Sequence, residues 1–254
     1  MQSLSVRELE RYDRQIRISE IGFEKQLKLK NSRVLVAGVG GLGGVAVLYL
    51  TAAGVGSIRI VDEGILELNN LNRQIIYSEK DVGRLKVEAA AERLKSLNPD
   101  IVVEPIPHKI TLENVDELLN NVDLVIDGLD NFKTRFIIND KCVERGIPFI
   151  HGAVYSLEGR LMTIIPGETP CLRCLIPSPP PEYDIIPVIG PVPGIIGCLE
   201  ALEAIKIITG IGKPLTNRIL IFDGFNLDFT YLPITKSPRC PVCSKLSQES
   251  KNDL

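Results

Sequence analysis

The chain has 254 residues, with 29 basic and 32 acidic side chains and a formal net charge of −3. Hydrophobic residues make up 44% and charged residues 24%, which is ordinary globular usage and excludes a disordered chain. A slightly acidic chain has no general attraction to nucleic acid or to an anionic membrane, so neither is an expected partner. Because the N-terminus lacks an apolar signal segment and no stretch is long enough to span a bilayer, a cytoplasmic protein is expected.

The first half of the chain alternates between predicted helices and predicted strands. Ser5 and Glu8 have the spacing of a capping box at the start of a helix over 5–18, and a polar stretch continues to Ser32. An apolar strand then runs into a glycine turn within 33–44. The elements expected after it are helix 42–53, strand 57–61, helix 82–97, strand 101–104, helix 111–119, strand 123–126, helix 132–145 and strand 148–151. Such βαβ repetition predicts an α/β fold with a doubly wound, mostly parallel, Rossmann-like sheet.

The second half is expected to extend this sheet with antiparallel strands. Strands are predicted at residue 155 and over 161–165, around a turn at Glu158–Gly159. The later elements are a proline-rich crossover loop at 175–193, an apolar helix at 194–209, a hairpin of 218–222 with 225–232, and a disordered polar tail at 244–254. Because the sequence contains neither a linker nor an internal repeat, residues 1–254 are expected to form a single domain.

A glycine turn is the first candidate binding feature. Gly38, Gly40 and Gly43 fit G-x-G-x-x-G between a strand and a helix, where backbone N–H groups approach a phosphate. Asp62 ends the next strand, at the distance along the chain expected of a carboxylate that binds a ribose hydroxyl. The pattern predicts an adenine nucleotide without separating NAD from ATP, and a purely structural strand–helix turn is the alternative.

Three charged residues after this turn favour a triphosphate. Arg73 and Lys86 supply cations for phosphate oxygens, although a surface salt bridge and a solvated helix lysine are the ordinary interpretations. Asp130 follows the strand that ends in Asp127, at the sheet edge where nucleotides bind, and is a candidate Mg²⁺ ligand. A helix cap at Asp130–Asn131 is the alternative.

The cysteine spacing predicts a metal centre. Cys171 and Cys174 form one C-x-x-C pair and Cys240 and Cys243 a second, and four thiolates suit a structural Zn²⁺ site. A redox pair or unrelated thiols are the alternatives, but neither pair is expected to start a helix after a strand, as a redox pair would. The remaining thiols lie within predicted helices and are expected to be buried, as is a structural histidine; these residues are Cys142, Cys198 and His151.

Several segments together resemble the MoeB/ThiF/HesA superfamily of ubiquitin-activating-type adenylyltransferases, and most of all its MoeB branch, the molybdopterin-synthase adenylyltransferases. The resemblance spans residues ~5 to ~243 in the order of the family's motifs. It rests on RYDRQIRI (11–18), GVGGLGG (38–44), Asp62, NNLNRQ (69–74), Lys86 and DGLDNFKTR (127–135).

The resemblance implies an enzyme that binds ATP with Mg²⁺ and adenylates the C-terminal Gly-Gly carboxylate of a ubiquitin-like sulfur-carrier protein, releasing pyrophosphate. It also implies a homodimer in which Arg14 reaches the partner's site, with Arg14, Arg73, Lys86 and Asp130 as catalytic residues, and one Zn²⁺ held by both C-x-x-C pairs. The predicted nucleotide-binding residues are Gly38, Gly40, Gly41, Gly43, Asp62, Asn69, Asn70, Asn72, Arg73, Lys86, Asp130 and Asn131.

One family feature is missing. Some relatives carry a cysteine in the crossover loop that takes the acyl group, but residues 175–193 contain none, so adenylation without a covalent intermediate is expected. Cys198 is the one candidate against this expectation. Two other functions remain open: an NAD-dependent oxidoreductase, favoured only by the glycine turn and Asp62, and a non-catalytic scaffold that holds a ubiquitin-like protein.

Overall fold

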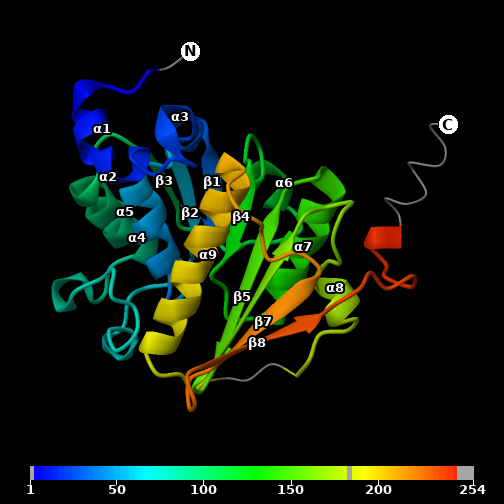
Figure 1. Ribbon diagram of the computed structural model, residues 1–254. Coiled ribbons are helices and arrows are strands. Elements are labelled where there is room, and N and C mark those ends of the chain that lie inside the picture. The colour runs from blue at the N-terminus through cyan, green and yellow to red at the C-terminus, as the bar shows by residue number, and fades with distance from the viewer. Residues whose placement is uncertain (1–2, 182–184, 245–254) are drawn as a thin grey trace.

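The computed structural model describes residues 3–181 and 185–244 and contains one eight-stranded sheet with helices on both faces (Figure 1). The strand order is β3-β2-β1-β4-β5-β6-β7-β8. The first five strands in this order pair in parallel with their neighbours, and the pairs β5–β6, β6–β7 and β7–β8 are antiparallel. The strands are β1 Arg33–Ala37, β2 Ser57–Val61, β3 Val102–Ile106, β4 Leu124–Asp127, β5 Phe149–Tyr155, β6 Glu158–Ile164, β7 Arg218–Asp223 and β8 Asp228–Pro233. The predicted doubly wound α/β fold with an antiparallel C-terminal extension is therefore confirmed.

The helices divide between the two faces of the sheet. In Figure 1, α4, α5 and α9 cross one face, while α6 and α7 lie behind the other. The helices are α1 Val6–Arg11, α2 Asp13–Ile16, α3 Gly22–Asn31, α4 Gly43–Ala53, α5 Lys86–Leu97, α6 Val115–Leu118, α7 Phe132–Arg145, α8 Leu172–Leu175 and α9 Pro191–Thr209, with 3-10 turns η1 Leu68–Asn70 and η2 Glu79–Asp81. Each face has its own buried apolar cluster, because β1 and β4 in the middle of the sheet bury apolar side chains on both sides.

Most predicted elements are present, with boundary differences that have local causes. The capping box is confirmed: the Ser5 hydroxyl accepts from the Glu8 N–H at 3.2 Å, and Glu8 accepts from the Ser5 N–H at 2.7 Å. The helix predicted over 5–18 is interrupted at the buried Tyr12, whose hydroxyl accepts a hydrogen bond from Asn98 at 2.8 Å. The helix expected from residue 82 begins only at Lys86, since Gly83 has a φ of +88°.

Other boundaries in the N- and C-terminal parts differ from expectation. The polar stretch before residue 32 contains α3, which buries Gln26 because its amide donates to the Ala53 carbonyl at 2.9 Å. The β5–β6 turn lies at Ser156, with a φ of +57°, rather than at Glu158–Gly159. The crossover loop ends earlier than predicted, since Pro191 begins α9, a position that suits its fixed φ.

Two predicted segments fall partly outside the described residues. These are the tail, of which only Ser244 is described, and the crossover loop at 182–184. Within the described part of the chain, no helix is long and apolar enough to cross a membrane.

Candidate nucleotide site and metal centre

The glycine turn joins β1 to α4, and three glycines there pack backbone against backbone. A Cβ on Gly38 would lie 2.6 Å from the Gly128 carbonyl oxygen, and one on Gly43 would lie 2.0 Å from the Gly38 oxygen. Gly38 also has a φ of +84°, a conformation that favours glycine. These glycines therefore bring β1, α4 and the end of β4 into close contact.

Gly40 and Gly41 differ from these glycines, because a Cβ there would meet side chains first rather than backbone. A Cβ on Gly40 would meet only the Gln74 amide, at 3.5 Å, and one on Gly41 would lie 3.2 Å from the Pro193 ring. Both residues immediately precede α4, whose N-terminal N–H groups favour an anion. The phosphate-binding role of this part of the turn stays a prediction.

Asp62 and Lys86 meet beside Gly64. Asp62 accepts hydrogen bonds from the N–H groups of Val39 at 3.0 Å and Gly64 at 2.7 Å, which ties the end of β2 to the glycine turn. A Cβ on Gly64 would lie 2.9 Å from Asp62 Oδ1 and 3.2 Å from Lys86 Nζ. The structure thus brings a carboxylate and an ammonium group to the same edge of the sheet.

The segment NNLNRQ folds over the glycine turn. Arg73 is half-buried; its guanidinium donates to the Asn69 carbonyl and to Asn72 Oδ1, each at 3.0 Å, and its own carbonyl oxygen lies close to Gly41. Asn70 is buried and accepts from the Glu67 N–H at 3.1 Å, so it shapes the segment from inside. Residues from the NNLNRQ segment, the end of β2 and the start of α5 therefore lie beside the glycine turn, although they are well apart in the sequence.

Asp130 is exposed just beyond β4, on the loop that Gly128 packs against the glycine turn. Asn131 is the N-cap of α7, since its side chain accepts from the Thr134 N–H at 2.9 Å, and its amide lies 3.4 Å from Asp130 Oδ1. The cap interpretation is confirmed for Asn131 and leaves the Asp130 carboxylate facing solvent. Asp130 as a Mg²⁺ ligand stays a prediction.

A buried network that the sequence analysis did not assign supports this loop. Asp127 is fully buried, forms a salt bridge with Arg135 at 3.1 Å, and lies 2.6 Å from Nδ1 of the buried His151. Arg135 also donates to the carbonyls of Leu129 and Gly152. Burial raises the pKa of Asp127, but the Arg135 charge and the His151 hydrogen bond outweigh it and lower that pKa below its usual value. The sequence signal for this ion pair is the eight-residue spacing of Asp127 and Arg135, which runs from the end of a strand into the next helix.

Glu200 is an unpaired acid next to this network. It is fully buried on α9, and neither carboxyl oxygen has a hydrogen-bond partner among the described residues. Burial, and then the charge of Asp127, raise the pKa of Glu200 well above its usual value. The side chain is therefore held in its neutral form at pH values where an exposed glutamate is ionised.

Replacing this acid with its amide tests the assignment. Above about pH 4.3 the unfolded chain loses the Glu200 proton while the folded chain keeps it, so the wild-type free energy of unfolding falls by up to about 1.4 kcal/mol per pH unit. The Glu200→Gln variant has no carboxyl proton at this position, so its free energy of unfolding does not fall in this way. The difference in free energy of unfolding, variant minus wild type, is therefore expected to increase between about pH 5 and about pH 7 in urea titrations.

Glu203→Gln is the matched control on the same helix. The Glu203 carboxylate accepts hydrogen bonds from Thr163 at 2.7 Å and from the Leu215 N–H at 2.6 Å, so this substitution is expected to destabilise the fold. A stability difference between Glu200→Gln and wild type that does not change with pH would contradict the neutral-acid assignment.

A cavity of about 250 Å³ adjoins the NNLNRQ segment at Asn72. Its other walls are the β5–β6 turn at Ser156–Leu157 and the end of the crossover loop at 187–190. The Ser156 N–H donates to the Pro187 carbonyl at 2.6 Å, which ties the loop to the turn. The cavity is thus a recess between the sheet end and the candidate nucleotide edge.

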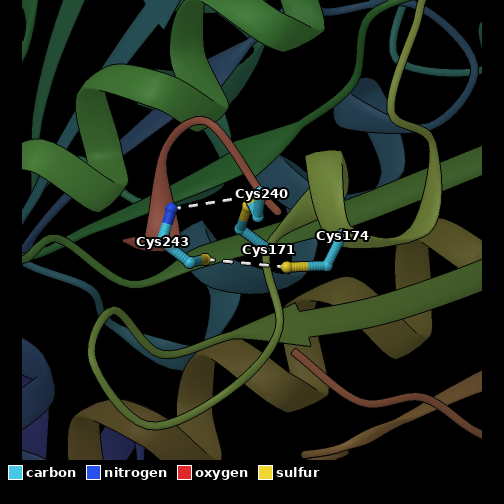
Figure 2. A group of neighbouring side chains, drawn as sticks. All are labelled: Cys171, Cys174, Cys240 and Cys243. Carbon is cyan, nitrogen blue, oxygen red and sulfur yellow. Dashed lines mark hydrogen bonds between the residues drawn. The ribbon is translucent and has the colours of Figure 1, made fainter. Parts of the chain in front are cut away.

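The four cysteines of the two C-x-x-C pairs converge on one point (Figure 2). The sulfurs of Cys171 and Cys240 are 3.6 Å apart, those of Cys174 and Cys243 are 3.7 Å apart, and all four lie within 4.8 Å of one another. Thiolates bound tetrahedrally to Zn²⁺ at about 2.3 Å are about 3.8 Å apart, so this arrangement fits the ion. Cys171 is the N-cap of the short helix α8, but this helix does not directly follow a strand, because residues 165–170 separate Cys171 from the end of β6.

The other two cysteines differ from each other. Cys142 is fully buried, as predicted, and burial raises the pKa of its thiol. Cys198 is only half-buried, contrary to prediction, because it lies on α9 beside Tyr49 of α4 rather than inside the core. Burial nevertheless raises the pKa of Cys198, which disfavours the nucleophilic thiolate.

Arg14 is exposed on α2, far from the glycine turn of its own chain. The neighbouring Gln15 donates to the Ala53 carbonyl at 3.1 Å, which docks α2 at the C-terminal end of α4. The candidate nucleotide edge lies at the other end of this 11-residue helix, about 16 Å away.

Comparison with known proteins gives consistent matches. The family model described as the ThiF family matches residues 12–242. The chain is 41% identical to the SAMP-activating enzyme E1 of Haloferax volcanii, over 99% of this chain and 95% of that protein. It is 42% identical to the sulfur carrier protein adenylyltransferase of Thermus thermophilus, over 93% of this chain and 91% of that protein.

Solved structures share the fold. A crystal structure of E. coli MccB with MccA-N7isoASN superposes with a TM-score of 0.83 at 26% identity, covering 94% of this chain and 75% of that one. A structure of E. coli MccB with ATP matches with a TM-score of 0.77 at 28% identity, covering 86% of this chain and 68% of that one.

Proposed function

The chain belongs to the ThiF family, and on that premise we propose that it adenylates the C-terminal Gly-Gly carboxylate of a ubiquitin-like sulfur-carrier protein at the expense of ATP. The support comes from the relatives, whose names describe a SAMP-activating enzyme and a sulfur carrier protein adenylyltransferase. An ATP-bound structure in the same fold supports the nucleotide.

The observation that carries the proposal is the position of three charged residues, Asp62, Arg73 and Lys86, around one glycine turn. Arg73 and Lys86 would supply the cations that an ATP triphosphate requires, and Asp62 would be the partner for the ribose. Gly40 leaves space in the turn, since a Cβ there would meet nothing closer than the Gln74 amide at 3.5 Å. An NAD site requires no such pair of cations, so the oxidoreductase alternative gains nothing from this geometry.

The proposed reaction needs charge neutralisation rather than a general base. A carboxylate oxygen of the carrier attacks the α-phosphorus of ATP, the bond from that phosphorus to the bridging oxygen breaks, and pyrophosphate leaves with the bond electrons. The attacking carboxylate is already ionised at neutral pH, so no proton is transferred. Arg73 and Lys86 would stabilise the charge on the phosphates, and Asp130 would hold a Mg²⁺ ion that adds to it.

The direct test is isotope exchange between pyrophosphate and ATP. Exchange is expected only with Mg²⁺ and a small ubiquitin-fold protein that ends in Gly-Gly, and it should be lost with the same carrier lacking those glycines. A folded, zinc-loaded protein that binds NAD tightly, binds no ATP and catalyses no exchange would overturn the proposal. One that binds the carrier without exchange would favour the scaffold alternative.

Arg14 is proposed to act in the site of a second copy, because its own glycine turn lies beyond the far end of α4. Arg14→Ala and Asp130→Ala are each expected to abolish exchange. Mixed dimers of the two variants contain one intact site, so an equal mixture should recover about a quarter of wild-type activity. Activity no higher than the sum of the two separate variants would show that Arg14 does not act across an interface.

The four-cysteine cluster is proposed to hold structural zinc. Bound there, Zn²⁺ would cross-link α8 to the segment after β8 and would have no open coordination position for chemistry. Because residues 175–193 contain no cysteine and Cys198 lies partly buried on α9, no covalent intermediate enters the proposed reaction.

A further inference from the structure

Helix α7 connects the candidate nucleotide edge with the four-cysteine cluster. Its first turn follows Asp130, and its middle touches the segment that carries the first cysteine pair. There the Leu172 N–H donates to Asn139 Oδ1 at 2.8 Å, and Asn139 is fully buried. The hydrogen bond therefore fixes one residue between the two cysteines against α7.

Arg173, the next residue between these cysteines, makes a stronger contact with α7. Its Nε lies 2.8 Å from both carboxylate oxygens of Asp140, and its Nη2 lies 2.7 Å from Asp140 Oδ2. The same guanidinium lies over the Phe136 ring, 4.4 Å from its centroid. A planar guanidinium held by a carboxylate and an aromatic ring has little freedom to move.

The other end of α7 is held just as firmly to the loop that precedes it. The rings of Phe132 and Phe136 are 6.1 Å apart, and the Arg135 guanidinium lies 5.2 Å from the centroid of Phe132. Arg135 in turn donates to the Leu129 carbonyl, one residue before Asp130. Packed and hydrogen-bonded groups thus extend from the first cysteine pair to Leu129, the residue before Asp130.

The charge of a zinc-loaded centre would favour a cation such as Arg173 beside the cysteines. Four thiolates around Zn²⁺ carry a net charge of about −2, and a cation near them stabilises the loaded centre. Asp140 of α7 orients the Arg173 guanidinium, which lies in the chain between two of the four cysteines.

We propose that Arg173 is a positioning residue that couples the four-cysteine zinc centre to Asp130 through α7. The link to Asp130 rests on the proposed function, whereas the link between the zinc centre and α7 does not. Arg173→Gln is the test variant. Arg145→Gln is the matched control, because Arg145 ties the end of α7 to α6 through the Asp116 carbonyl and the Asn120 side chain instead.

Two measurements need no ATP. In zinc-loaded Arg173→Gln, zinc transfer to a chromogenic chelator is expected to be about 10- to 100-fold faster than in wild type. Amide hydrogen exchange over residues 128–136 should be about 3- to 10-fold faster, and wild-type protein stripped of zinc should show the same increase. Arg145→Gln should change neither quantity in this way.

A third measurement links the inference to catalysis. The KM for Mg-ATP in pyrophosphate exchange should rise in Arg173→Gln by about 3- to 10-fold, with a smaller change in kcat. The inference would be overturned if the rates of zinc transfer and of amide hydrogen exchange in Arg173→Gln equalled those in Arg145→Gln. It would also be overturned if zinc transfer were faster while amide hydrogen exchange over residues 128–136 stayed at the wild-type rate. If wild type has no exchange activity, the proposed function fails while the first two measurements still decide the coupling of zinc to α7.

Discussion

Arg73→Ala is expected to lower carrier-dependent pyrophosphate exchange by about 10²- to 10³-fold, the usual loss when a preorganised charge donor is removed from a transition state. In the wild-type protein the Arg73 guanidinium donates to the Asn69 carbonyl and to Asn72 Oδ1, both within its own segment. Its removal should therefore leave the fold intact, with little change in thermal unfolding. The measurement is exchange at saturating carrier, together with a thermal melt of the same sample.

Arg73→Lys separates charge from geometry. Lysine keeps a positive charge but cannot offer two parallel N–H donors to phosphate oxygens, so activity between that of wild type and that of Arg73→Ala is expected. If Arg73→Ala keeps full exchange activity, the triphosphate interpretation of this crevice is wrong.

Cys240→Ser should empty the metal centre and produce the largest loss of stability. Cys240 is buried with its sulfur 3.6 Å from that of Cys171, and serine replaces a thiolate ligand with a poor one. Zinc content is expected to fall from one ion per chain to nearly none, and the free energy of unfolding by at least about 3 kcal/mol. Elemental analysis and urea denaturation measure the two effects.

Cys198→Ser is the control, since this half-buried cysteine lies on α9 outside the cluster. It should keep stoichiometric zinc and lose little stability. Chelator treatment of the wild-type protein should reproduce the Cys240→Ser melt. Full zinc content in Cys240→Ser, or a melt unaffected by chelator, would contradict a structural zinc site.

The sequence predicted the positions of several candidate nucleotide residues well, where position depends on residue type at short spacing. The glycine turn, Asp62 and the Asn131 cap lie where strand and helix ends were expected, because each depends on local backbone geometry. Helix α3 was missed because its composition is polar, and its burial depends on a distant partner, the Ala53 carbonyl.

Glu200 could not be assigned from sequence for a related reason. An acid within an apolar helix pattern does not show which neighbours will surround it. The tertiary structure brings it against Gly152, where a Cβ would lie 2.3 Å from Glu200 Oε1, and near the Asp127–Arg135 pair. Its neutral form is a consequence of that packing.

The fold class, the glycine turn, the cations beyond it and the two C-x-x-C pairs could all be predicted from the sequence, since each depends on residue types at fixed spacing along the chain. The meeting of the two cysteine pairs, the hydrogen bond from Arg135 to the loop before Asp130, and the contact of Arg173 with α7 became visible only in the folded chain. Such contacts depend on how the helices pack against the sheet, and packing brings together side chains whose separation in the sequence carries no signal.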